Sequence, residues 1–152
     1  MDIASASAKD ITLLIVEDEV LAAMTLRDAF EDAGYRVLDL TGRHQEALAE
    51  ARAEKPDFAL VNIQLEGSDS GIALAHDLKA MGIPSLFISG QVDKARSAQT
   101  DAVGSLPKPY RTEDMVNAVA YLLRHLKGDE TFPRPPGLEV FDTKPDLVPD
   151  AT

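Results

Sequence analysis

The sequence contains no cysteine, which excludes a disulfide framework and thiol catalysis. Only 15 Lys and Arg stand against 26 Asp and Glu, and the net charge of −11 argues against nucleic acid as a direct partner. No apolar run approaches the roughly 18 residues that a membrane-spanning helix needs. Residues 1–10 lack the basic start and the apolar core of a signal peptide. We therefore predict a soluble, cytoplasmic protein that binds neither nucleic acid nor membrane.

What is present is enough apolar sequence for one sizeable core: 45% of the 152 residues are hydrophobic. Five short apolar runs are typical of strands buried in a parallel sheet: 11–16, 36–41, 58–62, 85–89 and 103–106. Helices are expected between and after them, at 20–33, 42–55, 71–81, 91–101 and 112–127. This alternation predicts a doubly wound parallel α/β sheet, with the most apolar runs (13–16, 58–61 and 86–88) at its centre.

Local signals set the ends of several predicted helices. In the first helix, apolar residues recur at roughly helical spacing, and Gly34 closes the segment: Val20, Leu21, Met24, Ala29 and Phe30. Thr112 is a candidate N-cap for the last helix, whose apolar stripe is the clearest in the chain.

The chain divides into three parts. Residues 1–10 are a small, polar lead, 11–127 form one domain, and 128–152 are an acidic, proline-rich C-terminal extension. The extension also carries apolar residues at Phe132, Leu138, Val140, Phe141, Leu147 and Val148. It is therefore either a disordered tail or an arm that docks on this domain or on a neighbour.

Polar side chains stand at the ends of four predicted strands, where open α/β sheets keep their sites. They are Glu17 with Asp18, then Asn62, Ser89 and Lys108. An acidic pair suits a hard cation such as Mg²⁺, and a hydroxyl and an ammonium suit phosphoryl oxygens. The combination points to phosphoryl chemistry on a carboxylate.

Four segments in this order resemble the receiver domain of two-component response regulators: 14–19, the strand ending at Asn62, 87–90 and 106–110. The resemblance covers about residues 10–127. It implies a flavodoxin-like (CheY-like) fold, with a five-stranded parallel sheet in the order 2-1-3-4-5 and helices on both faces. It also implies Mg²⁺ at Glu17, Asp18 and the backbone carbonyl of Gln64, with Ser89 as the switch hydroxyl and Lys108 binding phosphate.

Asn62 departs from the family, whose phosphoacceptor at this place is an aspartate. A neutral amide has delocalised its lone pair and cannot form a stable acyl phosphate. Its oxygen can still face a cation, which leaves room for weak binding of Mg²⁺ or Ca²⁺. Glu66 stands where the family usually has proline, and Ser105 replaces the usual aromatic switch residue.

Two hypotheses follow. In the first, the chain is a single-domain receiver of a two-component or phosphorelay pathway that acts by protein docking and is not phosphorylated at Asn62. Its partner is a histidine kinase, a phosphotransfer protein or a second copy, bound through the 91–127 face or the C-terminal arm. In the second, Asn62 replaces a native phosphoaccepting aspartate and traps the unphosphorylated state.

We do not expect a free-standing enzyme. A phosphate-cradling loop and a dinucleotide fingerprint are both missing from the sequence. A phosphatase with a first-strand aspartyl nucleophile would carry a second acid two residues later, whereas Asp18 is followed by Glu19 and Val20.

Each candidate also has a simpler interpretation. Asp18 alone would be a helix N-cap, Ser89 a turn-closing hydroxyl, and Lys108 a surface lysine between two prolines. The acidic loop 66–69 is more simply a solvated turn than a substitute acceptor. Three histidines lie on predicted helices without metal-ligand spacing and are expected at the surface: His44, His76 and His125.

Overall fold

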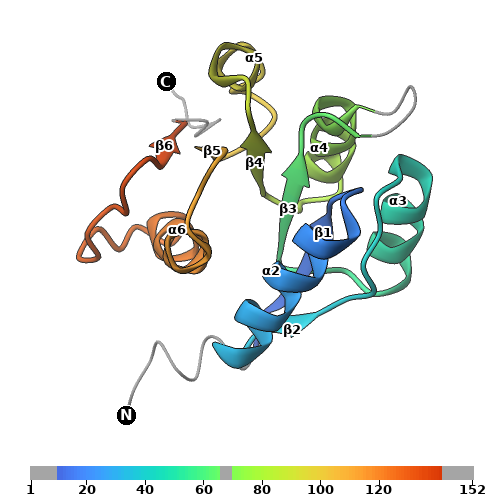
Figure 1. Ribbon diagram of the computed structural model, residues 1–152, viewed down its shortest axis with the longest axis horizontal. Helices are drawn as coiled ribbons and strands as arrows, with labels where there is room; N and C mark the ends of the chain where they lie inside the picture. The colour runs from blue at the N-terminus through green and yellow to red at the C-terminus, as the bar shows by residue number, and fades with distance from the viewer. Residues whose placement is uncertain (1–9, 66–69, 142–152) are drawn as a thin grey trace, which may run out of the picture.

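The apolar runs of the sequence form adjacent strands of a single sheet (Figure 1). The computed structural model describes residues 10–65 and 70–141. The elements, in chain order, are β1 (Thr12–Val16), α2 (Val20–Asp32), β2 (Arg36–Val37), α3 (His44–Ala53), β3 (Phe58–Asn62), α4 (Gly71–Ala80), β4 (Ser85–Ser89), α5 (Val92–Ser97), β5 (Gly104–Pro107), α6 (Thr112–His125) and β6 (Glu139–Val140).

The sheet has the order β2-β1-β3-β4-β5-β6. Its first five strands are all parallel, so the predicted order 2-1-3-4-5 is confirmed. The sixth strand was not predicted: β6 comes from the C-terminal extension and pairs antiparallel with the edge of β5. The three strands expected at the centre, β1, β3 and β4, are central, and every residue of β3 and β4 is buried.

Helices cover both faces of the sheet because side chains alternate along each strand. Leu13 and Ile15 of β1 lie in a core cluster with residues of α2 and α6. Leu14 and Val16 point the other way, into a second cluster with residues of α3 and α4. A third cluster joins α4 and α5 on the same side as the second. The molecule is thus a three-layer α/β/α sandwich.

The structure shows which face of α2 is buried, and it corrects one expected helix cap. Of the apolar residues that recur along this helix, Phe30 is buried, whereas Val20 and Leu21 are 67% and 78% exposed. The other buried residues of α2 are Ala23 and Leu26. The helix therefore contacts the sheet through a stripe three and four residues apart, which leaves the apolar residues of its first turn outside. Thr112 is not an N-cap: Arg111 holds that position, and its side chain makes no capping hydrogen bond.

Other boundaries shifted by a few residues. The second strand is only Arg36–Val37, and the chain touches the sheet again through a single bridge between Thr41 and Val16. Helix α5 is limited to Val92–Ser97. The loop 66–69 and residues 1–9 and 142–152 lie outside the described residues. No helix in the part of the chain that the structure describes is both long and apolar enough to span a membrane.

Candidate functional site

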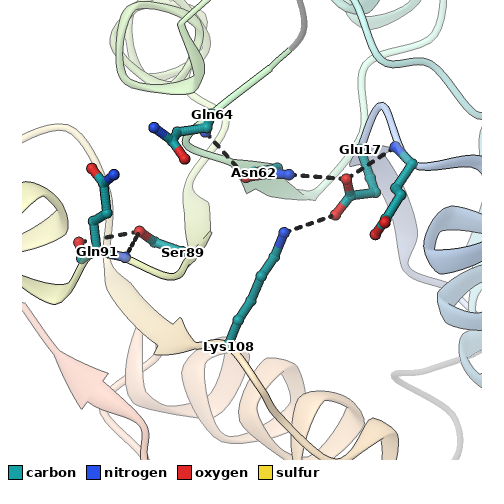
Figure 2. Close-up of polar contacts among 7 residues, drawn as sticks. Glu17, Asn62, Gln64, Ser89, Gln91 and Lys108 are labelled. Atoms are coloured by element: carbon teal, nitrogen blue, oxygen red, sulfur yellow. Dashed lines mark hydrogen bonds and ion pairs between the residues drawn. The ribbon is translucent and has the colours of Figure 1, made fainter.

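The carboxyl ends of β1, β3 and β5 bring three polar side chains into contact (Figure 2). Glu17 follows β1, Asn62 is the last residue of β3, and Lys108 follows β5. Asn62 and Glu17 are 5% and 3% exposed, although both are polar. Buried polar groups need partners, so their contacts define what the site is able to do.

Both ends of the Asn62 amide are engaged. Its Nδ2 donates to Glu17 Oε2 at 2.9 Å, and its Oδ1 accepts from the backbone N–H of Gln64 at 3.1 Å. The second of these bonds closes the turn that leaves β3. The side chain thus serves as donor and acceptor at once, which a carboxylate, an acceptor only, does not do.

Glu17 is the buried acid of the site. Its Oε2 also accepts from the backbone N–H of Glu19 at 3.1 Å, and its Oε1 lies 3.8 Å from Lys108 Nζ. Burial raises the pKa of Glu17, and the Asn62 amide, the Glu19 N–H and the Lys108 charge lower it by less. Among the described residues, Glu17 Oε1 has no hydrogen-bond partner.

Lys108 reaches into the site from the far side of β4. Its backbone N–H donates to Ser89 O at 2.8 Å, and its peptide bond with Pro109 is cis. Its side chain is 37% exposed and points toward Glu17 and Asn62 (Figure 2). Two residues later, burial raises the pKa of Tyr110 to about 12, with smaller contributions from the charges of Glu17 and Glu19.

Ser89 ends β4 and is buried beside Lys108. Its hydroxyl accepts from the Gln91 N–H at 2.8 Å and donates to the Gln91 carbonyl at 3.1 Å (Figure 2). These are the contacts of a turn-closing hydroxyl, the simpler of its two interpretations. The switch role of Ser89 stays a prediction.

Asp18 and Glu17 line a cleft of about 570 Å³ between the start of α2 and the loop that enters α3. Asp18 is not the N-cap of α2, because Glu19 occupies that position. The carboxylates of Glu17 and Asp18 are hard oxygen donors, and Glu17 Oε1 accepts no hydrogen bond among the described residues, so the pair fits a divalent cation. Gln64 is exposed at the end of β3, where its carbonyl would complete the set. Residues 10–65 and 70–141 contain no group of three or more His, Asp or Glu side chains suited to a metal ion.

Sequence reasoning missed the residues that shape this cleft. The Glu17 N–H donates to Thr41 O at 2.9 Å, and the Thr41 hydroxyl donates to Glu46. A Cβ on Gly42 would lie 2.6 Å from Asp18 Cα, so only glycine lets this loop approach the acid pair so closely. No period or motif marks these positions in the sequence, since they matter only once the chain has folded.

The three histidines are less free than expected. His44 lies 2.9 Å from Asp77, His76 lies 3.0 Å from Asp101, and His125 lies 2.6 Å from Glu130. His44 and His125 are only partly exposed, so the expectation of surface histidines holds for His76 alone. Each pair joins two segments of the chain, which is a structural role.

Comparisons with known proteins agree with this geometry. The family model of the response regulator receiver domain matches residues 13–120. The transcriptional regulatory protein PdtaR of Mycobacterium tuberculosis is 29% identical over 113 residues, which cover 70% of this chain and 54% of that protein. The positive alginate biosynthesis regulatory protein of Pseudomonas aeruginosa is 38% identical over 112 residues, 70% of this chain and 45% of that protein.

The likeness extends to solved structures. The crystal structure of a CheY-like response regulator receiver domain protein from Methanospirillum hungatei matches with a TM-score of 0.68 at 21% identity. It covers 78% of this chain and 97% of that one, and shows the same flavodoxin-like fold. The chain spans about half the length of the curated relatives it matches. It belongs to the family of response regulator receiver domains of two-component signalling.

Proposed function

We propose that this receiver signals by docking to another protein and does not accept a phosphoryl group at residue 62. One observation carries the proposal: the side chain at the end of β3 is an amide whose nitrogen faces Glu17 at 2.9 Å. An attacking group there would need an electron pair free for phosphorus. The amide nitrogen instead directs its N–H at a carboxylate, and the amide oxygen is held by the Gln64 N–H.

The other residues of the site are suited to binding a cation, even though residue 62 is not suited to accepting a phosphoryl group. Glu17 and Asp18, with the Gln64 carbonyl, would hold Mg²⁺, whose charge stabilises phosphoryl oxygens when it is bound. The Asn62 N–H already serves one oxygen of Glu17, so part of the acid pocket is satisfied without metal. We expect weaker Mg²⁺ binding than in a site with three carboxylates.

The test is the intact mass of the full chain after incubation with acetyl phosphate and Mg²⁺. The proposal expects no change in mass and no transfer from acetyl phosphate. Addition of one phosphoryl group that depends on Mg²⁺ and is lost at alkaline pH, as acyl phosphates are, would overturn it. A chain heated before incubation controls for adventitious acylation by the donor.

A second candidate function rests on the position of Lys108. Its ammonium group is still aimed at the pocket of Glu17 and Asn62, as a phosphoryl-accepting site would require. Under this candidate, position 62 natively carries aspartate, and Asn62 traps the unphosphorylated state. Asn62→Asp should then gain a phosphoryl group from acetyl phosphate, and a Lys108→Ala change in that variant should reduce the gain. An Asn62→Asp chain that stays unmodified would count against this candidate.

The partner surface is suggested by the apolar residues that α2 leaves outside. Val20 and Leu21, with Met24 one turn later, are exposed beside the acidic cleft. Apolar side chains gathered on a surface next to a site often mark contact with another protein. These residues support docking of a histidine kinase or a phosphotransfer protein on the surface beside the cleft. We also propose that the chain is not itself an enzyme.

A further inference from the structure

The C-terminal extension does more than end the chain: it fills the free edge of β5. Strand β6 pairs Glu139 with Ser105 and Val140 with Gly104, and the Phe141 N–H donates to Val103 O at 3.0 Å. In Figure 1, β6 lies outside β5, next to α5 and α6. Without this segment, β5 would present unpaired backbone groups at the sheet edge.

Side chains of the segment alternate between two receiving surfaces. Leu138 and Val140 pack into the core cluster that includes α6, and Leu138 is buried. Phe141 is buried in the cluster of α4 and α5, which includes Ala75, Ala95 and Ala98. The edge of β5 therefore offers backbone pairing together with an apolar cluster on each face of the sheet.

Charge and shape add selectivity. Arg96 Nε of α5 donates to both carboxylate oxygens of Glu139, at 2.9 and 3.0 Å. A Cβ on Gly104 would lie 2.8 Å from Glu139 O, so glycine in β5 is what lets the added strand come close. The groove is therefore selective for an extended segment that has, in succession, an apolar residue, an acidic residue, a second apolar residue and an aromatic residue.

We propose that the β5 edge is a strand-binding groove for an extended segment of a partner protein, and that residues 138–141 close it in cis. The partner segment carries the pattern that the arm itself shows, with its acid on Arg96 and its aromatic side chain in the pocket of Phe141. Adding a strand to a free edge is a general way to bind an extended peptide. The groove is a second docking surface, separate from the exposed apolar residues of α2, and its biological meaning rests on the docking role proposed above.

An arm in cis competes strongly because it is tethered. A short tether gives an effective concentration in the millimolar range, so a free segment binds poorly until the arm is released. The link from α6 is partly held: the Arg124 guanidinium lies 4.0 Å from the centre of the Phe132 ring. The groove therefore opens when the contacts of Leu138, Glu139 and Phe141 are lost, even while the segment between α6 and β6 keeps its contact with Arg124.

The test uses the full chain and a fluorescent peptide with the sequence of residues 135–142. Phe141→Asp should release the arm and bind this peptide at least about tenfold more tightly than the unchanged chain does. Phe132→Asp is the matched control, because Phe132 is an exposed aromatic residue of the same arm outside the groove. It should leave peptide binding as weak as in the unchanged chain.

Two further variants locate the binding. Gly104→Ala in the Phe141→Asp chain should abolish peptide binding, since its Cβ would meet the peptide backbone. Arg96→Glu should weaken binding of the normal peptide, and a peptide with arginine at the position of Glu139 should restore it. If Phe141→Asp does not fold, as judged by circular dichroism, Glu139→Arg opens the groove by changing a surface side chain only.

Several outcomes would overturn the inference. The first is equal peptide binding by the unchanged chain and by the variants with a released arm. The second is no peptide binding by a released variant that is folded. The third is peptide binding that Gly104→Ala does not weaken. A concentration-dependent dimer of the unchanged chain that exchanges arms would contradict closure in cis. None of these measurements involves Asn62, so failure of the groove and failure of the proposed function are distinguishable.

Discussion

At position 62, an amide nitrogen faces a carboxylate oxygen at 2.9 Å. An aspartate there would place two like charges at about the same separation, which costs on the order of 1–4 kcal/mol at effective dielectrics of about 80 to 20. We predict that Asn62→Asp lowers the free energy of unfolding by about this amount in chelator. Mg²⁺ should recover much of the loss, because the extra carboxylate is also a cation ligand. Urea unfolding with and without Mg²⁺ measures both effects.

Asn117→Asp is the matched control for this prediction. It makes the same chemical change at an exposed position of α6, where solvent screens the added charge. Its free energy of unfolding should change little, and Mg²⁺ should not affect it. Equal stability of Asn62→Asp and the unchanged chain in chelator would contradict the account of Asn62.

Glu17 gives a pH dependence of the opposite sign to that of most native carboxylates. Its folded pKa is raised above the ordinary value of 4.5 by burial, so the unfolded chain releases this proton more readily. The contribution of Glu17 to stability is fully present below pH 4.5 and is lost as pH rises through its folded pKa. Above its folded pKa, the ionised form of Glu17 therefore opposes folding.

We predict that Glu17→Gln raises the free energy of unfolding at pH 7 in chelator. A glutamine oxygen still accepts from Asn62 Nδ2 and from the Glu19 N–H, so both hydrogen bonds are kept. The ion pair with Lys108 at 3.8 Å is lost, but burial outweighs it in its effect on the pKa of Glu17. The difference between the two chains should shrink as pH falls toward 4.5. Chemical unfolding across this range checks it, and a variant less stable than the unchanged chain at pH 7 would refute it.

Among the elements, the junction of β3 and α4 is the tightest contact in the site. The Gly71 N–H donates to Ile63 O at 2.8 Å, and a Cβ on Gly71 would lie 2.1 Å from Asn62 O. No such contact surrounds Gly90, where an added Cβ would meet nothing within 4 Å. Because overpacking of a rigid backbone contact costs about 1–3 kcal/mol or more, the two glycines should respond differently to substitution.

We predict that Gly71→Ala lowers the free energy of unfolding by at least about 2 kcal/mol and that Gly90→Ala changes it little. The first variant must also displace the end of β3. The side-chain NMR signals of Asn62 should therefore shift in Gly71→Ala and stay in place in Gly90→Ala. Similar melting temperatures for the two variants would show that α4 moves aside easily.

Elements with many apolar residues could be predicted from the sequence, and those held by a few contacts could not. The limits of β3 and β4 were predicted to the residue, because continuous apolar runs between turn residues have few other interpretations. The spacing of apolar residues in α2 did not define its buried face, because exposed apolar residues outnumber buried ones in its first turn. Strand β6 is two residues long among prolines and leaves no periodic signal.

The site shows the same division. Resemblance to a family located Glu17, Asn62 and Lys108, and the fold brings them into contact. It did not reveal that the Asn62 amide would donate to Glu17, because a hydrogen bond depends on side-chain direction as well as position. Gly42 and Thr41 shape the cleft only through backbone approach, which no residue pattern encodes.

For the whole molecule, the net charge of −11 is an unfavourable term that folding must overcome. Repulsion between acidic side chains is clearest at the end of α2, which carries Asp28, Glu31 and Asp32 and has no basic residue in its last turn. Acids at a helix C-terminus oppose the helix dipole as well as one another, by about 0.3–1 kcal/mol each. Salt screens both effects over a distance of about 30 Å at 0.01 M and about 3 Å at 1 M.

We therefore predict that the melting temperature rises as NaCl is increased from about 0.01 to 0.5 M, a range over which screening shortens several-fold. Surface ion pairs such as Arg36 with Glu54 lose strength over the same range, but each contributes only about 0–1 kcal/mol, and acids exceed bases overall. Glu31→Lys should raise the melting temperature at low salt, and its melting temperature should rise less with added NaCl than that of the unchanged chain. A melting temperature that falls with NaCl would mean that the ion pairs, and not the excess of acids, dominate the electrostatics of this fold.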